Sequence, residues 1–223
     1  MVHRRAVPPG AEIQALRPRA AVCGLRARGD GGRAAGLTPL GPVLHQAARN
    51  YVHARRRPVG GSAFARHFRR DMAQMLRDAV AHRPERLMVR ASVGAPGWAA
   101  VPWLACFAPH VTRSMRHGLY VAILIDAPAE AVILSLQHGA AEALTRHGPI
   151  AGPAMLRAMA EETRARLDRP APPPLTLAAA GDLARGYEAG SALWRSWRGD
   201  MGGFGPALQA MLDDYRALVG GAS

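Results

Sequence analysis

Four strand-like segments follow one another in the middle of the chain, and this order restricts the fold more than any other feature of the sequence. Residues 87–93 alternate apolar and polar side chains, which is typical of a half-buried strand. Further strand-like runs occupy 101–107, 119–125 and 132–136. The link at 127–130 is short enough for a hairpin, so the last two strands are expected to pair in antiparallel orientation.

Helical segments are predicted on both sides of these strands. Residues 42–56 form the first, and Ser62 caps a second whose apolar stripe extends to Val80. The later helices are expected to begin at Pro153, Asp182 and Pro206. In the helix from Asp182, an apolar face is assigned to Leu183, Tyr187, Trp194 and Trp197, and residues 175–177 are compatible with a short edge strand.

Helices, then consecutive strands, then helices again predict an α+β fold rather than an alternating βαβ arrangement. The expected architecture is a small, mostly antiparallel, curved sheet of about four to five strands. Helices from the N-terminal and C-terminal parts flank this sheet. The folded domain is assigned to residues 41–220. Residues 1–40 are rich in Arg, Gly and Pro and are interpreted as a disordered basic tail, or as an upstream start codon assigned in error.

The charge is strongly one-sided. The formal net charge is +13, and all 29 cationic side chains are arginines. Residues 1–40 hold seven arginines against two acids, and residues 41–90 hold eleven against three. The remainder is neutral, with eleven of each. Such a distribution is expected of a region that meets a polyanion, either nucleic acid or an anionic membrane surface; the alternative is a solvated face in an arginine-rich protein.

The absence of lysine excludes several enzyme classes from these 223 residues. A P-loop needs a lysine at its phosphates, and Schiff-base chemistry needs a lysine amine. No Ser/His/Asp, paired-carboxylate or metal-ligand spacing is recognisable, so we expect no catalytic residues, no metal site and no cofactor. Cys23 and Cys106 are far apart, which indicates a reduced, cytoplasmic protein. No run reaches 18 apolar residues, so no membrane partner is expected.

Several short motifs resemble the McrB-like N-terminal domain family. The stretch SVGAPGWAAVPW at residues 92–103 is similar to the family's GS-G-G-W-PW signature. The stretch HGLYVAIL at 117–124 resembles the family's G-Y-V-L strand, and LSLQHG at 134–139 is similar to its LSLNQG hairpin. GYEAG at 186–190 and LQAMLDDYRAL at 208–218 resemble its C-terminal helices. The blocks occur in the family's order.

The resemblance implies a DNA-reading domain of a methylcytosine-dependent restriction system, which flips a modified cytosine out of double-stranded DNA into an aromatic pocket. It implies a pocket formed by Trp103, Tyr120 and Leu124, and the period of two along a strand puts Tyr120 and Leu124 on one face. It further implies a DNA-contacting loop made of Ser92, Gly94, Ala95, Pro96, Gly97 and Trp98. A GTPase motor or nuclease would then be supplied by a separate subunit.

The chain departs from the family at the loop. Ala95 stands where the family has a residue that wedges into the vacated base stack, and Pro96 replaces a glycine. Two other functions therefore remain open: a sequence-blind duplex binder with a decayed reading loop, or a protein-docking subunit of a defence system. Phosphate contacts are assigned to Arg66, Arg69, Arg70, Arg90, Arg113 and Arg116, since guanidinium groups bind phosphate oxygens bidentately.

Overall fold

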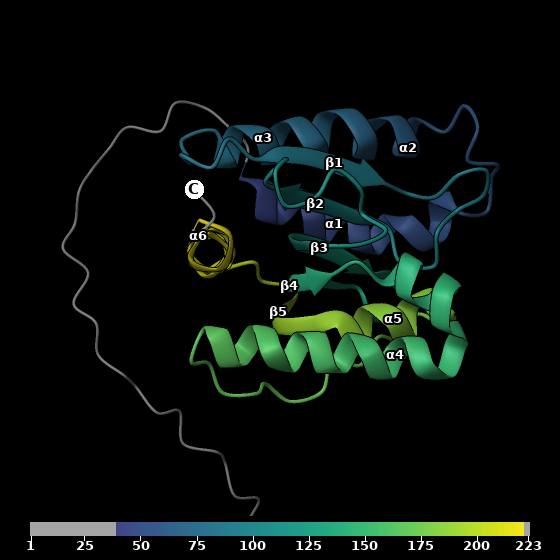
Figure 1. The fold of residues 1–223 in the computed structure, drawn as a ribbon. Coiled ribbons are helices and arrows are strands. Elements are labelled where there is room, and N and C mark those ends of the chain that lie inside the picture. Colours follow the sequence, from purple (N-terminus) through teal and green to yellow (C-terminus); the bar gives the residue numbers. More distant parts are fainter. Residues whose placement is uncertain (1–38, 221–223) are drawn as a thin grey trace, which may run out of the picture. The chain divides into compact units, whose positions relative to one another are not determined.

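The computed structural model describes residues 39–220, so the expected tail at 1–40 lies almost entirely outside the described residues. Within them, five strands form one antiparallel sheet in the order β1-β2-β3-β4-β5. The strands are β1 (Met88–Ser92), β2 (Trp103–Phe107), β3 (Leu119–Asp126), β4 (Ala131–His138) and β5 (Ser191–Arg198). Helices cover both sides of this curved sheet (Figure 1), so the predicted α+β class is confirmed.

The central strands are buried on both faces. Every residue of β4 is buried, and in β3 only Leu119 is partly exposed. A strand with apolar side chains on both faces needs a packed layer on each side. The helices supply these two layers.

The first layer consists of helices from both ends of the described chain. It contains α1 (Leu40–Ala54), a helical run from α2 (Ala63–His67) through the π-helical turn η1 (Phe68–Met72) to α3 (Ala73–Val80), and α6 (Phe204–Val219). Their apolar residues share one core cluster with Leu104, Ile123 and Leu134 of the sheet.

The second layer consists of α4 (Ala140–Arg166) and α5 (Asp182–Gly190), on the opposite side of the sheet in Figure 1. Leu156 and Tyr187 from this layer form a second cluster with the sheet residues Ala105, Tyr120 and Leu124. The alternation along β3 therefore sends Ile123 to one layer and Leu124 to the other.

The expected start of a helix at Pro153 is wrong, because helical structure already begins at Ala140. Gly148 interrupts it with φ 77° and ψ −178°, and Pro149 follows directly. A proline at the first position of a new helical segment loses no intrahelical hydrogen bond. The break therefore divides α4 into two segments, and the sequence reading detected only the second.

The assignment of Trp194 and Trp197 to a helix is also wrong. The helix α5 ends at Gly190, and both tryptophans lie on β5, where Trp197 pairs with Val132 of β4. A spacing of three puts two residues on one helical face but on opposite strand faces. Trp197 packs on Phe204 of the first layer, with ring centroids 5.2 Å apart, whereas Trp194 belongs to the second cluster.

Residues 175–177 are not a strand, although Leu175 and Leu177 are buried in the second cluster. The backbone amides of residues 177–179 donate to side-chain carboxylates instead of to the carbonyl oxygens of a neighbouring strand. The amide of Leu177 donates to Glu188, and the amides of Ala178 and Ala179 donate to Asp126 at 2.7 and 3.0 Å. An extended apolar segment thus packs against the sheet without joining it.

Within residues 39–220, no helix combines the length and apolar character needed to cross a membrane.

His138 makes the stability of the fold sensitive to acid. It is buried at the end of β4, with Nε2 2.8 Å from Thr163 Oγ1, and burial lowers the pKa of its imidazole to about 4. In the unfolded chain a histidine has a pKa of about 6.5. Between these two pKa values the unfolded state binds a proton that the folded state does not. The contribution of His138 to stability is therefore fully present above pH 6.5 and is lost as the pH falls towards 4.

We therefore expect the free energy of unfolding to fall from pH 6.5 to pH 4, and the fall to be shallower in His138→Gln. Urea denaturation at a series of pH values measures both slopes, and the carboxylates contribute equally to each. Equal slopes in the two proteins would show that His138 is not responsible.

Candidate nucleic-acid interface

The loop between β1 and β2 is closed on itself and anchored to the first helical layer. The amide of Ala99 donates to the carbonyl oxygen of Val93 at 2.7 Å, which closes the loop. The Tyr51 hydroxyl of α1 donates to the carbonyl oxygen of Ala99 at 2.7 Å and lies 3.3 Å from that of Val93. Tyr51 is completely buried, and this burial raises its pKa to about 12 against the opposing effect of Arg55 and Arg69.

Trp98 provides a second anchor for the same loop. Its indole N–H donates to the carbonyl oxygen of Arg57 at 2.7 Å. Its ring meets Tyr51 edge-on, with centroids 5.4 Å apart and planes at 85°, and Phe64 lies 6.2 Å from it. The aromatic side chains of α1, α2 and the loop therefore form one contact group.

The tip of the loop is held from its base and points outward. The amide of Gly94 donates to Ser92 Oγ at 3.1 Å, and Arg69 donates to the carbonyl oxygen of Gly94. Ala95, Pro96 and Gly97 are exposed, and the peptide bond between Ala95 and Pro96 is cis. The loop thus presents a tip with little side-chain volume on a base fixed by hydrogen bonds.

Gly94 is the residue whose replacement tests this geometry. Its φ is +97°, and a Cβ there would lie 2.3 Å from the Gly97 carbonyl oxygen and 2.4 Å from the Ala99 amide nitrogen. We expect Gly94→Ala to destabilise the protein by more than about 1 kcal/mol, because strain and backbone overlap add.

The matched control is Gly97→Ala, where a Cβ meets no heavy atom within 4 Å. This change should stay within about 0.5 kcal/mol of the wild type in the same urea titration. Similar values for the two variants would contradict the loop geometry.

The Tyr51 hydroxyl is the second test of the loop. Tyr51→Phe keeps the buried ring and removes the donor to the Ala99 carbonyl oxygen, so we expect a loss of about 1–3 kcal/mol in the free energy of unfolding. Tyr187→Phe is the control, because that hydroxyl makes no hydrogen bond to another described residue. A Tyr51→Phe protein as stable as this control would show that the hydroxyl does not hold the loop.

The three residues assigned to a base pocket share one face of the sheet. Trp103 pairs with Leu124 across β2 and β3, and all three belong to the second cluster. Tyr120 and Leu124 are only 3% and 1% exposed, whereas Trp103 is half-buried. The Tyr120 hydroxyl donates to the carbonyl oxygen of Met115 at 3.1 Å, and burial raises its pKa well above the ordinary value. A base can reach Tyr120 only after its covering side chains move.

The arginines assigned to phosphate contacts form two groups with Arg90 between them. Arg66, Arg69 and Arg70 lie on α2 and η1, and Arg69 contacts the β1–β2 loop. Arg113 and Arg116 lie in the connection from β2 to β3, at the other end of β2. The five residues of β2 span about 13 Å, so both groups fit within one short stretch of duplex.

Some of these guanidinium groups already have partners. Arg66 donates to the carbonyl oxygen of Gly61 at 2.8 Å, and Arg116 contacts Thr145 Oγ1 at 3.4 Å. The Arg90 guanidinium lies 5.9 Å from the ring centroid of Phe107. Arg70 and Arg113 are exposed and make no ion pair with any residue between 39 and 220.

Tyr51 and the arginines that follow α1 were not among the residues predicted from the sequence. Tyr51 follows the apolar spacing of its helix, which identifies a buried ring but not the loop that its hydroxyl binds. The signal available was the run Arg55–Arg57 beside a Pro-Val-Gly-Gly turn in the most basic part of the chain.

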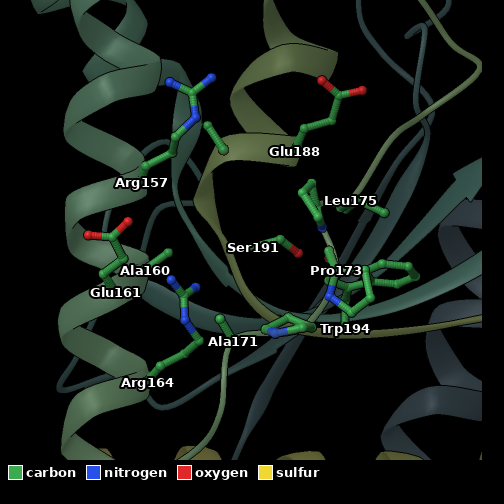
Figure 2. A pocket seen from close by; sticks show the side chains of 13 residues that line it. Arg157, Ala160, Glu161, Arg164, Ala171, Pro173, Leu175, Glu188, Ser191 and Trp194 are labelled. Atoms are coloured by element: carbon green, nitrogen blue, oxygen red, sulfur yellow. The ribbon is translucent and has the colours of Figure 1, made fainter.

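A separate cavity of about 350 Å³ lies between α4, α5 and β5 (Figure 2). Arg157 and Arg164 line it together with Glu161 and Glu188, so its charged side chains balance. Trp194 closes one side, with its indole N–H bonded to the carbonyl oxygen of Pro173 at 2.9 Å. This balance does not favour a polyanion, in contrast to the loop and its arginines.

Two further observations concern chemistry elsewhere in residues 39–220. No group of three or more His, Cys, Asp or Glu side chains there is arranged to hold a metal ion. Cys106 is fully buried, and burial raises the pKa of its thiol to about 12, which keeps it protonated at neutral pH.

A protein-family model described as MrcB-like, N-terminal domain matches residues 46–218. The match begins within α1, spans all five strands and ends within α6. No curated protein matches the chain.

Proposed function

Because the chain belongs to the MrcB-like N-terminal domain family, which supports a DNA-binding role in restriction systems, we propose that it binds duplex DNA through the loop 93–99 and reads modified cytosine there. The observation that carries the proposal is the loop itself. Its base is fixed by Tyr51 and Trp98, its tip is exposed, and Arg69 contacts it at Gly94.

The physical basis for duplex binding is electrostatic. Arginine forks bind phosphate oxygens and release condensed counterions, which gives affinity without reading sequence. The two arginine groups, one on α2 and η1 and one at the end of β2 away from the loop, would contact the backbone of the same duplex. A loop already ordered by hydrogen bonds costs little entropy when it binds.

The proposal includes the flipping of a modified base out of the duplex. Extruding a base costs a few kcal/mol, and stacking it on an aromatic side chain returns about 1–3 kcal/mol. Trp103 is half-buried at the edge of the shared face and is the first of the three assigned residues that a base would meet. Tyr120 and Leu124 would be reached after Met115, which accepts the Tyr120 hydrogen bond, moves away.

A sequence-blind duplex binder is the second candidate function, and the burial of Tyr120 and Leu124 favours it. In that case the loop and the arginines bind backbone and shape, and the small tip at Ala95–Gly97 inserts nothing between bases. Neither candidate assigns catalysis or a cofactor to these residues. A motor or nuclease would come from another polypeptide segment, and binding to cellular DNA implies a cytoplasmic location.

The first test is fluorescence anisotropy of the full chain with matched duplexes that carry cytosine, 5-methylcytosine or 5-hydroxymethylcytosine at two salt concentrations. We expect tighter binding of one modified duplex at both salts, because base contacts are less salt-dependent than phosphate contacts. Equal affinity for all three duplexes, with a large loss of affinity at the higher salt concentration, would support the sequence-blind candidate. Absence of duplex binding would refute both.

The variant Trp103→Ala tests the pocket in the same assay. We expect the preference for the modified duplex to fall by about fivefold or more, since stacking on an aromatic ring is worth about 1–3 kcal/mol. Trp194→Ala is the control, because it removes a half-buried tryptophan of the same cluster from the edge strand β5, three strands away from β2. Loss of preference in both variants would point to general loosening of the cluster.

A further inference from the structure

Three consecutive arginines follow α1, and their backbone is fixed by hydrogen bonds. The Arg55 guanidinium lies 5.9 Å from the ring centroid of Tyr51. The amides of Arg55, Arg56 and Arg57 donate to the carbonyl oxygens of Tyr51, His53 and Ala54 at 3.0, 3.2 and 3.3 Å. All three residues are exposed, and none forms an ion pair within the described part of the chain. We call this segment, Arg55–Arg57, the arginine turn.

A groove of about 640 Å³ lies beside the arginine turn. The end of α1, the turn and the start of α2 form its walls, and the lining residues are Asn50, His53, Ala54, Arg57, Pro58, Gly60, Gly61, Ser62, Ala63 and Phe64. None of them is acidic. The cavity in Figure 2 differs in this respect, because two carboxylates there offset two guanidinium groups.

The groove and the loop 93–99 share a wall. The carbonyl oxygen of Arg57 accepts the Trp98 indole N–H, and Phe64 lines the groove while its ring lies 6.2 Å from that of Trp98. Arg66 reaches the opposite rim, where it donates to the carbonyl oxygen of Gly61. A ligand seated on the loop therefore lies next to the groove as well.

Duplex DNA carries one charge per 1.7 Å of its axis, so a strand that passes the loop presents phosphates to any adjacent cationic surface. We infer that the arginine turn and the groove beside it form a further phosphate-binding surface, which holds the DNA backbone on the flank of the loop. This inference rests on the proposed DNA binding and extends it to residues outside the family signature.

The test replaces the cations and retains the Tyr51 hydroxyl and the Arg57 carbonyl oxygen, which anchor the loop. Arg55→Gln, Arg56→Gln and Arg57→Gln are combined in one variant, in which the backbone carbonyl that binds Trp98 is retained. The control variant combines Arg157→Gln, Arg195→Gln and Arg198→Gln, which removes the same charge from exposed positions of α4 and β5. Thermal melting of both variants verifies that each is folded.

The measured quantity is the slope of log Kd against log salt concentration for an unmodified duplex. Each lost phosphate contact should reduce this slope by about 0.9, so we expect a reduction of about two to three in the arginine-turn variant and of less than about one in the control. A third variant with lysine at the three positions should restore most of the slope, because the slope depends on charge.

The outcomes distinguish a failure of the role assigned to the arginine turn from a failure of the proposed DNA binding. A wild-type chain that binds duplex, with equal slopes for the wild type and the arginine-turn variant, would overturn the role of the turn alone. Equal reductions in the variant and its control would do the same, since net charge would then explain both. A wild-type chain that binds no duplex, but binds phosphatidylserine vesicles through the turn, would overturn the proposed DNA binding as well.

Discussion

The burial of β3 and β4 on both faces is the constraint on which the rest of the structure depends. A sheet with apolar side chains on both sides must be covered twice, and the chain does so with helices from before and after the strands on one side and α4 and α5 on the other. The middle of the sheet is then covered by side chains on both faces. Its ends and the partly exposed edge strands β1 and β5 remain available for binding.

The same helical layer that covers the sheet also shapes the candidate interface. A buried tyrosine hydroxyl needs a hydrogen-bond acceptor, and the nearest ones for Tyr51 are the carbonyl oxygens at the two ends of the β1–β2 loop. Core packing of α1 therefore fixes the position of a surface loop. The helices of this layer also carry five of the eleven arginines in residues 41–90, and three more follow α1 directly. Shape and charge at the interface thus have one structural origin.

The assigned base pocket lies within the second core cluster, where side-chain packing contributes to stability. Tyr120 and Leu124 are as buried as the aliphatic residues around them, and Trp103 marks the border of the cluster. If this face accepts a base, part of the binding energy must open it, so recognition would be coupled to a local rearrangement. If it does not, the two buried residues serve the fold alone.

Hydrophobic period and turn chemistry in the sequence were sufficient to place the four strands from 87 to 136 and the helices at both ends, because these signals are local. They failed at Trp194 and Trp197, where a spacing of three fits a helix but the residues belong to a strand that only pairing with β4 stabilises. They also failed at 140–147, which precedes a break at Gly148.

The sequence by itself determined which side chains are apolar, where the charge is concentrated and in what order the elements follow. Only the tertiary structure decided which layer covers which face, that Tyr120 and Leu124 are buried, and that Tyr51, Trp98 and Arg57 meet at one loop. Periodicity reports the direction of a side chain relative to its own element. Its partner on another element depends on long-range packing, which no local pattern contains.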